Sequence, residues 1–446
     1  MAAPLSPDLS ARPGAPILPY PAGPVVQSGQ ARREKVPMNL LAVRRLPVRV
    51  EALQPLAWRD YRRLWLASFL WYLARWVEVV VVGWLVLDLT DSAWHVALVG
   101  FYRNAPLLCF GLLGGVIADR MVRRTLLALA QGLNCAVMLG LWLLLVSGGL
   151  QYWHLAVGSL LLGLSWTMDW PARRTLIADI VGRPQILRAL VLETTSMNIT
   201  KVLGPLLGGS LVGLLGAAGC FLLLLGTYLG SLGAVLSIRQ RNRTPAGQGP
   251  VLRTLVDGLR AVARQPAILG VLSVTMAMNM LVFPYVQLLP VFARDIHQAG
   301  PVGLGLLAAG DGLGSLLGAA LLSLWPTLPR GRAFLGGSFL MSLALLAFSL
   351  LPAFLPAFLA LVAMGVCHAA FSAYQSAITL TAITETLRGR AMGALALAIG
   401  TAPLGALLMG ALATLVGAPA AVGLSAALGA LWVLLTAWRL ADLRRV

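Results

Sequence analysis

Long apolar runs separated by short basic turns are the feature that most constrains this chain. Of its 446 residues, 59% are hydrophobic and only 11% are charged, whereas soluble domains carry about 25% charged residues. Runs such as Leu64–Leu87 and Leu126–Val146 exceed the roughly 20 apolar residues that cross a bilayer as a helix. The sequence therefore predicts an all-α protein that crosses a membrane many times.

The spacing of the apolar runs predicts twelve spanning helices, at about 64–87, 93–117, 125–147, 153–172, 189–214, 218–238, 267–290, 302–325, 333–351, 355–380, 391–414 and 418–438. If the sides of the membrane alternate along this order, all but four of the 34 Lys and Arg residues fall on the side of residue 1. Three of the exceptions lie within helices, and Arg294 lies on the opposite side. Because basic residues accumulate in cytoplasmic loops, we expect both termini in the cytoplasm. The net charge of +18 then marks orientation, and nucleic acid is not an expected partner.

Two polar stretches interrupt the apolar pattern and suggest the domain boundaries. Residues 1–57 are rich in Pro, Gly, Ala and Arg, and we expect a disordered basic tail there. Residues 240–266 should form a cytoplasmic linker that contains an interfacial helix. The regions 58–239 and 267–438 would then be two six-helix bundles, followed by a short basic C-terminal tail at 439–446.

Cysteine, histidine and glycine patterns argue against metal binding and ATP hydrolysis. The four Cys and four His residues are scattered without metal-ligand spacing. The P-loop pattern G-x-x-x-x-G-K-[ST] does not occur, so an ATPase activity of the chain itself is not expected. We predict no metal, no cofactor and no enzymatic activity.

A charged turn joins the second and third expected helices. Residues 115–124 read G-V-I-A-D-R-M-V-R-R. A carboxylate there can accept hydrogen bonds from the N–H groups of a neighbouring helix N-terminus, and the Arg side chains can pair with carboxylates or lipid phosphate. Together with the expected end of helix four and a second basic turn, these residues would form a cytoplasmic gate. Alternatively, the Arg residues only set the orientation of the chain in the membrane. The predicted gate residues are Gly115, Asp119, Arg120, Arg123, Arg124, Asp169, Arg173, Arg388 and Arg390.

The fifth expected helix carries the pattern G-P-x-x-G-G, made by Gly204, Pro205, Gly208 and Gly209. Glycines at this spacing let another helix backbone approach closely, and Pro removes a backbone donor and bends the helix. Residues 402–410 of the eleventh expected helix read A-P-L-G-A-L-L-M-G. The two segments are candidates for equivalent positions in a duplicated unit, which is the architecture of many transporters.

Charges inside the expected helices are functional candidates, because an unpaired charge in lipid is costly. Arg75 and Glu78 share one face of helix one, and Arg103 on helix two lies at nearly the same depth. Lys201 on helix five and Asp311 on helix eight also lie at comparable depths. The candidates for proton coupling are Glu78, Asp311 and His368. A permanent structural network of Arg75, Glu78 and Arg103 is the alternative to a proton carrier.

The motifs together carry a family resemblance. The phrases D-Y-R-R-L-W-L-A-S-F, G-G-V-I-A-D-R-M-V-R-R, L-G-P-L-L-G-G and E-T-L-R-G-R-A-M-G follow in this order through residues 58–440. They resemble the major facilitator superfamily, and within it the branch that contains enterobactin and macrolide exporters. Two positions depart from the usual pattern, because Val122 and Thr200 stand where the family usually has Gly.

The resemblance implies twelve transmembrane helices in two pseudo-symmetric six-helix bundles of the cell membrane. It implies a monomeric, proton-coupled exporter of a small amphipathic molecule, such as a drug or a siderophore, that works by alternating access. Open alternatives are a nutrient importer or facilitator of the same fold, and a transport-dead membrane sensor or scaffold. The expected partners are the substrate, protons and the lipid bilayer.

The resemblance also suggests which helices meet and which line a cavity. Helices five and eight meet between the bundles of the family, so a contact between Lys201 and Asp311 in one conformation would bias alternating access. Helices one, seven and ten line the family's cavity, although each polar residue there is alone more often a helix–helix hydrogen bond. The cavity candidates are Trp71, Trp76, Asn279, Tyr285, Gln287, Tyr374 and Gln375.

Overall fold

The protein is described by a computed structural model that covers residues 53–239, 265–324, 329–382, 388–440 and 443–444. The side chains of 109–120, 183 and 388–390 lie outside the description, as do most of the expected tail 1–57 and linker 240–266. The described residues belong to one unit, Val48–Val446. Among them, nine helices are long and apolar enough to cross a membrane.

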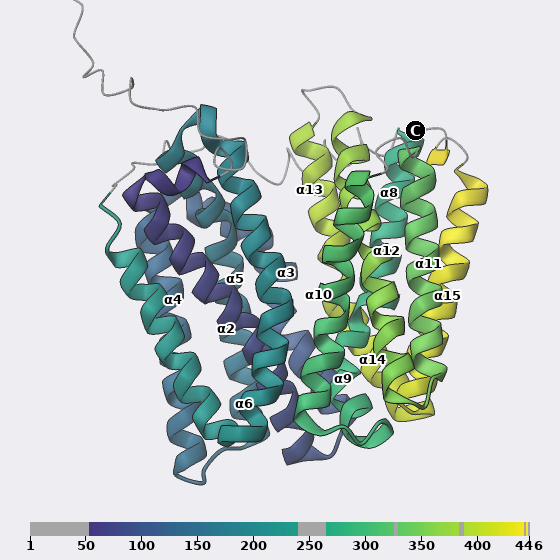
Figure 1. Ribbon diagram of the computed structural model, residues 1–446, viewed down its shortest axis with the longest axis horizontal. Coiled ribbons are helices and arrows are strands. Elements are labelled where there is room, and N and C mark those ends of the chain that lie inside the picture. The colour runs from purple at the N-terminus through teal and green to yellow at the C-terminus, as the bar shows by residue number, and fades with distance from the viewer. Residues whose placement is uncertain (1–52, 240–264, 325–328, 383–387, 441–442, 445–446) are drawn as a thin grey trace, which may run out of the picture. The chain divides into compact units, whose positions relative to one another are not determined.

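Five long helices form the first bundle, and Figure 1 shows them in purple to teal. They are α2 (Arg59–Thr90), α3 (Ala93–Arg120), α4 (Arg123–Val146), α5 (Tyr152–Val181) and α6 (Ile186–Leu236), with short 3-10 turns at η1 (Gln54–Ala57) and η2 (Arg183–Gln185). Local chemistry sets the turns between them. Asp91 ends α2 in the left-handed conformation, with φ of 49°, and Gln151 and His154 cap the start of α5 reciprocally.

Helix α6 is two helices joined at a kink. Gly216 has φ of 65° and ψ of −179°, whereas the rest of the 51-residue helix keeps helical backbone angles. Only glycine adopts such a conformation at low cost. The kink lies between the ranges 189–214 and 218–238 that the sequence predicts for two separate helices, so one element holds both.

Helix α5 corrects an expected boundary. The sequence predicted that helix four ends at residue 172, but α5 continues through Pro171 to Val181. Its last turns are stabilised because Leu176 and Ile177 are buried in a hydrophobic cluster with Tyr61 of α2. This packing outweighs the missing N–H group of one proline. Asp169 and Arg173, predicted to lie in a terminal turn, are therefore inside the helix.

The second bundle runs from green to yellow in Figure 1. Its elements are α8 (Pro266–Ala277), the π-helical turn η3 (Met278–Val282), the 3-10 helix η4 (Phe283–Leu288), α9 (Leu289–Val291), the π-helical turn η5 (Phe292–Ile296), α10 (Gly300–Leu324), α11 (Arg330–Leu350), α12 (Phe354–Thr381), α13 (Arg388–Ile399), α14 (Ala402–Val416) and α15 (Ala418–Arg439). Two expected single helices are interrupted. Pro284 and Pro290 lie where 267–290 changes helix type, and Pro403 opens α14 after a turn at Gly400.

The two bundles meet mainly along α6 with α10 and along α3 with α14 (Figure 1). Glycine makes the first contact possible. A Cβ atom on Gly209 would lie 2.4 Å from the carbonyl oxygen of Pro301, and one on Gly305 would lie 2.5 Å from that of Pro205. The backbones of α6 and α10 therefore approach too closely for a side chain at either position.

The ends of the helices define two opposite sides that differ in charge. At one side, here called the basic end, Arg63 and Arg124 of the first bundle donate hydrogen bonds to the carbonyl groups of Ser237 and Leu236. At the other side, here called the Arg294 end, the Arg294 side chain crosses between bundles. It donates to the Leu87 carbonyl oxygen at 3.1 Å and pairs with the Asp91 carboxylate.

Candidate functional site

A buried ion cluster lies within the first bundle, between α2 and α3. The Nη2 atom of Arg103 lies 2.5 Å from Oε1 of Glu78, whose side chain is fully buried. The Nη1 atom of Arg75 lies 3.7 Å from Oε2 of the same carboxylate. The three residues that the sequence placed at one depth are thus in contact. One acid faces two bases within the same bundle.

A second buried cluster centres on Asp169 and Arg173 of α5. Nε and Nη2 of Arg173 donate to the two oxygens of Asp169 at 2.6 and 2.8 Å, and Nε2 of Gln131 donates to Asp169 at 2.7 Å. Nη1 of Arg173 donates to the Ser68 hydroxyl of α2 at 2.9 Å. These side chains therefore join three helices inside the bundle, and not at the end turn where the sequence placed them.

Stacked aromatic rings connect the two clusters. The Arg75 guanidinium lies 4.9 Å from the ring centroid of Trp166, and Trp166 stacks on Trp71 at 5.0 Å. The Arg173 guanidinium lies 4.7 Å from the centroid of Trp71. Each cation is attracted to the face of an indole ring. No sequence pattern indicates this arrangement, because it depends on the rotation of α2 against α5.

A third ionic cluster bridges the two bundles. The Nζ atom of Lys201 on α6 lies 2.6 Å from Oδ2 of Asp311 on α10. The other oxygen of Asp311 lies 2.9 Å from Nδ1 of His368 on α12, and Ser315 is a weaker neighbour at 3.4 Å. The Lys201–Asp311 contact predicted from the sequence is present. His368 was a separate candidate, and the structure adds it to the same carboxylate.

The glycine and proline pattern of α6 packs against both bundles. Gly204 and Gly208 face α2, since Cβ atoms there would lie 2.3 Å from Trp76 and 3.1 Å from Val80. Gly209 faces α10, as described above. Pro205 lies inside α6, and the non-helical backbone of this helix is at Gly216. The pattern thus provides close packing, as predicted.

Most of the predicted cavity residues lie in helix packing. Trp71, Asn279, Tyr285 and Gln375 are buried, and Gln375 donates to the Thr275 hydroxyl at 2.7 Å. The remaining three are partly buried. Trp76 packs on α6, and the Gln287 side chain packs directly against Gly100 of α3. Tyr374 packs on the main hydrophobic core. In this conformation they connect helices.

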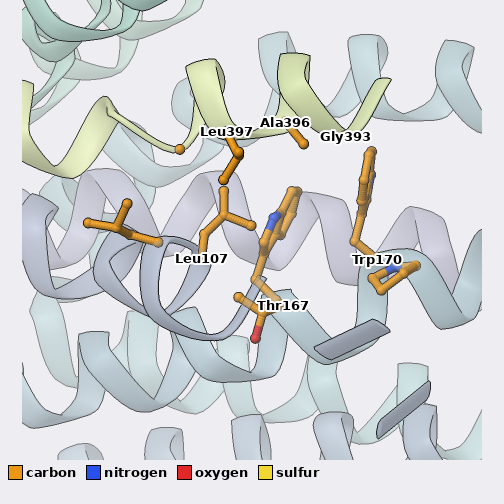
Figure 2. Close-up of a pocket in the computed structure, with 10 residues that line it drawn as sticks. Leu107, Thr167, Trp170, Gly393, Ala396 and Leu397 are labelled. Carbon is orange, nitrogen blue, oxygen red and sulfur yellow. The ribbon is translucent and has the colours of Figure 1, made fainter. Parts of the chain in front are cut away.

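An apolar pocket lies between the bundles, at a place that the sequence did not indicate (Figure 2). It is lined on one side by α3 and α5 and on the other by α13, and its empty volume is about 800 Å³, including the part open to the surroundings. In Figure 2, Leu107 lies opposite Leu397 across the pocket, whereas the oxygen of Thr167 is directed away from α13. The full lining is Leu107, Leu108, Trp166, Thr167, Trp170, Pro171, Gly393, Ala396, Leu397 and Gly400.

The predicted gate is only partly described. Arg123 pairs with Asp179 of α5, and Arg124 contacts the end of α6, so both connect helices of the first bundle at the basic end. The predicted residues Gly115, Asp119, Arg120, Arg388 and Arg390 have side chains outside the described part of the chain. Their role in a gate stays a prediction.

Solved transporters share this fold. A POT family transporter in complex with a thioalcohol-conjugated peptide matches with a TM-score of 0.72 and 12% identity, over 86% of this chain and 96% of that one. A bacterial homologue of the human lysosomal transporter Spinster matches with a TM-score of 0.65 and 15% identity, over 86% and 96%. The two-bundle arrangement is thus the fold of these solved structures.

Sequence comparison identifies the family, which consists of multi-pass major facilitator transporters of the cell membrane. The family model described as "Transmembrane secretion effector" matches residues 50–445, and the chain belongs to this family, whose members are transporters and not enzymes. It is 27% identical to the multidrug efflux pump Tap of Mycolicibacterium fortuitum over 356 residues, which cover 76% of this chain and 86% of Tap. It is 29% identical to the enterobactin exporter EntS of Shigella flexneri over 381 residues, which cover 79% and 87%.

Proposed function

We propose that this protein exports a small amphipathic molecule by alternating access, driven by proton exchange. The direction is supported by relatives that are named as an efflux pump and an enterobactin exporter. The substrate class is supported by the pocket, whose lining combines aliphatic side chains with Trp166 and Trp170. Apolar walls with few polar groups suit the apolar part of an amphipathic or aromatic molecule.

The observation that carries the proposal is the combination of a pocket between the bundles with an ion pair between the bundles. The pocket is lined by α3 and α5 of one bundle and α13 of the other, so a relative rotation of the bundles would change its shape. The Lys201–Asp311 pair joins α6 to α10. A pair of this kind is broken when the bundles separate, and it therefore favours one state over the other.

Proton coupling is assigned to the Lys201–Asp311–His368 cluster. Protonation of Asp311 would remove the charge that holds Lys201, and His368 contacts the same carboxylate and could exchange a proton with it. Glu78 was the first choice from the sequence. Its two Arg neighbours belong to the same bundle and stay beside it when the bundles move, so we now propose a structural role for it.

The proposed topology has twelve spans, with α6 counted as two helices and α13 with α14 as one. The basic end faces the cytoplasm, because Arg residues concentrate there and Arg294 lies at the opposite end. The domains are the two bundles with the tail, linker and C-terminal segment predicted from the sequence. A monomer is sufficient, because one chain supplies both walls of the pocket.

A deletion strain tests this function. It should become hypersensitive to amphipathic drugs or retain its own metal chelators inside the cell, and inverted membrane vesicles should accumulate the same compound when a pH gradient is imposed. An importer would give the opposite phenotype, with reduced uptake in the deletion strain. Vesicles that accumulate no compound in any gradient would indicate a sensor or scaffold.

A further inference from the structure

Glu193 on α6 is a buried acid that none of the roles above uses. Its side chain is 3% exposed, and neither carboxyl oxygen has a hydrogen-bond partner of normal geometry among the described residues. Ser68 and Tyr72 of α2 are neighbours of the carboxyl group. An ionised carboxylate in this environment would lose its hydration without receiving equivalent hydrogen bonds.

The charges around Glu193 do not balance if the group is ionised. The nearest cation is Arg173, and its hydrogen bonds go to Asp169 and Ser68. Two acids therefore share one base, which is the reverse of the Glu78 cluster. The titratable and charged groups that surround Glu193 are Tyr61 and Tyr72 on α2 and Asp169 and Arg173 on α5.

We propose that Glu193 binds a proton in this conformation and is a proton site of the protein, separate from the Asp311 cluster. Close carboxylates that share one cation ionise one at a time, because the second charge is repelled by the first. Asp169 accepts three hydrogen bonds from Arg173 and Gln131, whereas the carboxyl oxygens of Glu193 accept none of normal geometry from the described residues. The proton therefore resides on Glu193.

The site is connected to the substrate pocket. Arg173 lies over Trp71, Trp71 stacks on Trp166, and Trp166 lines the pocket. When Glu193 loses its proton, a second anion appears beside Arg173, and the guanidinium is drawn away from its position over Trp71. This movement would shift the stacked rings of Trp71 and Trp166 and so change the shape of the pocket wall. This link to transport rests on the proposed function, whereas the binding of a proton does not.

Infrared difference spectroscopy on the purified full-length protein tests the proton site without any substrate. The protonated carboxyl group has a C=O stretching band that disappears when the pH is raised. We expect this band in the native protein, its loss in Glu193→Gln and its retention in Asp88→Asn, which removes an exposed carboxylate of α2. A band of native size in Glu193→Gln would overturn the proposal.

Glu193→Asp keeps the test decisive if the Gln variant does not fold. The shorter side chain moves the carboxyl group away from α2 and α5, so the pH at which the band is half lost should shift by roughly one unit, a tenfold change in proton affinity. An unchanged midpoint would overturn the proposal. If the protein transports nothing in vesicles but the band behaves as expected, the proposed function fails and the proton site remains.

Discussion

The Glu78 cluster and the Asp311 cluster have similar composition but different positions. Each contains one carboxylate with two basic partners, and both carboxylates are buried. Arg75 and Arg103 belong to the same bundle as Glu78, so rigid-body movement of the bundles leaves that cluster intact. Lys201 belongs to the other bundle from Asp311, so the same movement breaks that pair. Under the proposed alternating access, the location of the partners decides whether an ion cluster stabilises one bundle or controls the movement between the two.

The largest expected effect comes from breaking the cluster inside the bundle. Glu78→Gln leaves Arg75 and Arg103 buried without a counter-charge, and removal of one partner of a buried pair costs about 3–5 kcal/mol. Thermal unfolding in detergent should show a clearly lower midpoint, and Glu78→Gln combined with Arg103→Gln should recover part of the loss. An unfolding midpoint of Glu78→Gln equal to that of the native protein would contradict a structural role for this cluster.

A smaller loss is expected where the bundles pack through glycine. Gly209→Ala places a methyl group against the Pro301 carbonyl oxygen and Gly305, and overpacking of this kind costs about 1–3 kcal/mol. Gly213→Ala is the matched control, because a Cβ there would meet Val302 at an ordinary 3.7 Å. Thermal unfolding should show a lower midpoint for Gly209→Ala than for Gly213→Ala. Equal midpoints would mean that the close approach of α6 and α10 contributes nothing to stability.

Neutralising the cluster between the bundles should affect transport more than stability. Lys201 and His368 are partly exposed, so their charges stay partly hydrated in Asp311→Asn and the protein should still fold. Uptake driven by a pH gradient into inverted vesicles should fall at least about tenfold, or ~1.4 kcal/mol, for the compound found with the deletion strain. Native uptake in Asp311→Asn would remove this cluster from the coupling mechanism.

The smallest effect is expected at the Arg294 end. Arg294 also crosses between bundles, but its partner Asp91 is 84% exposed, and exposed ion pairs contribute about 0–1 kcal/mol. Arg294→Ala should therefore leave the unfolding midpoint nearly unchanged, and added salt should weaken even this difference. A loss as large as that in Glu78→Gln would show that depth in the membrane is not what separates strong from weak pairs.

Charges were easier to place from the sequence than cavities. Depth along each helix indicated the partners of Glu78, because a buried charge requires a partner at the same level. The Lys201–Asp311 contact needed the family resemblance as well, which implies that helices five and eight meet. The pocket depends on helix rotation, which brings Trp166 of α5 opposite α13. Glu193 lay inside an expected span and could have been recognised as a buried acid. Its neighbouring cation Arg173 could not, because the expected helix four ended at residue 172 and left Arg173 outside the membrane.

Distances between spin labels test the central claim of movement between the bundles most directly. Exposed positions Thr175 and Arg332 report on the basic end, and Asp88 and Leu355 report on the Arg294 end, with Thr175 and Arg62 as a pair within one bundle. When the pH is changed across the range in which uptake responds, the account predicts that one distance between bundles shortens while the other lengthens, and that the control stays fixed. Unchanged distances at both ends in protein that transports would contradict it.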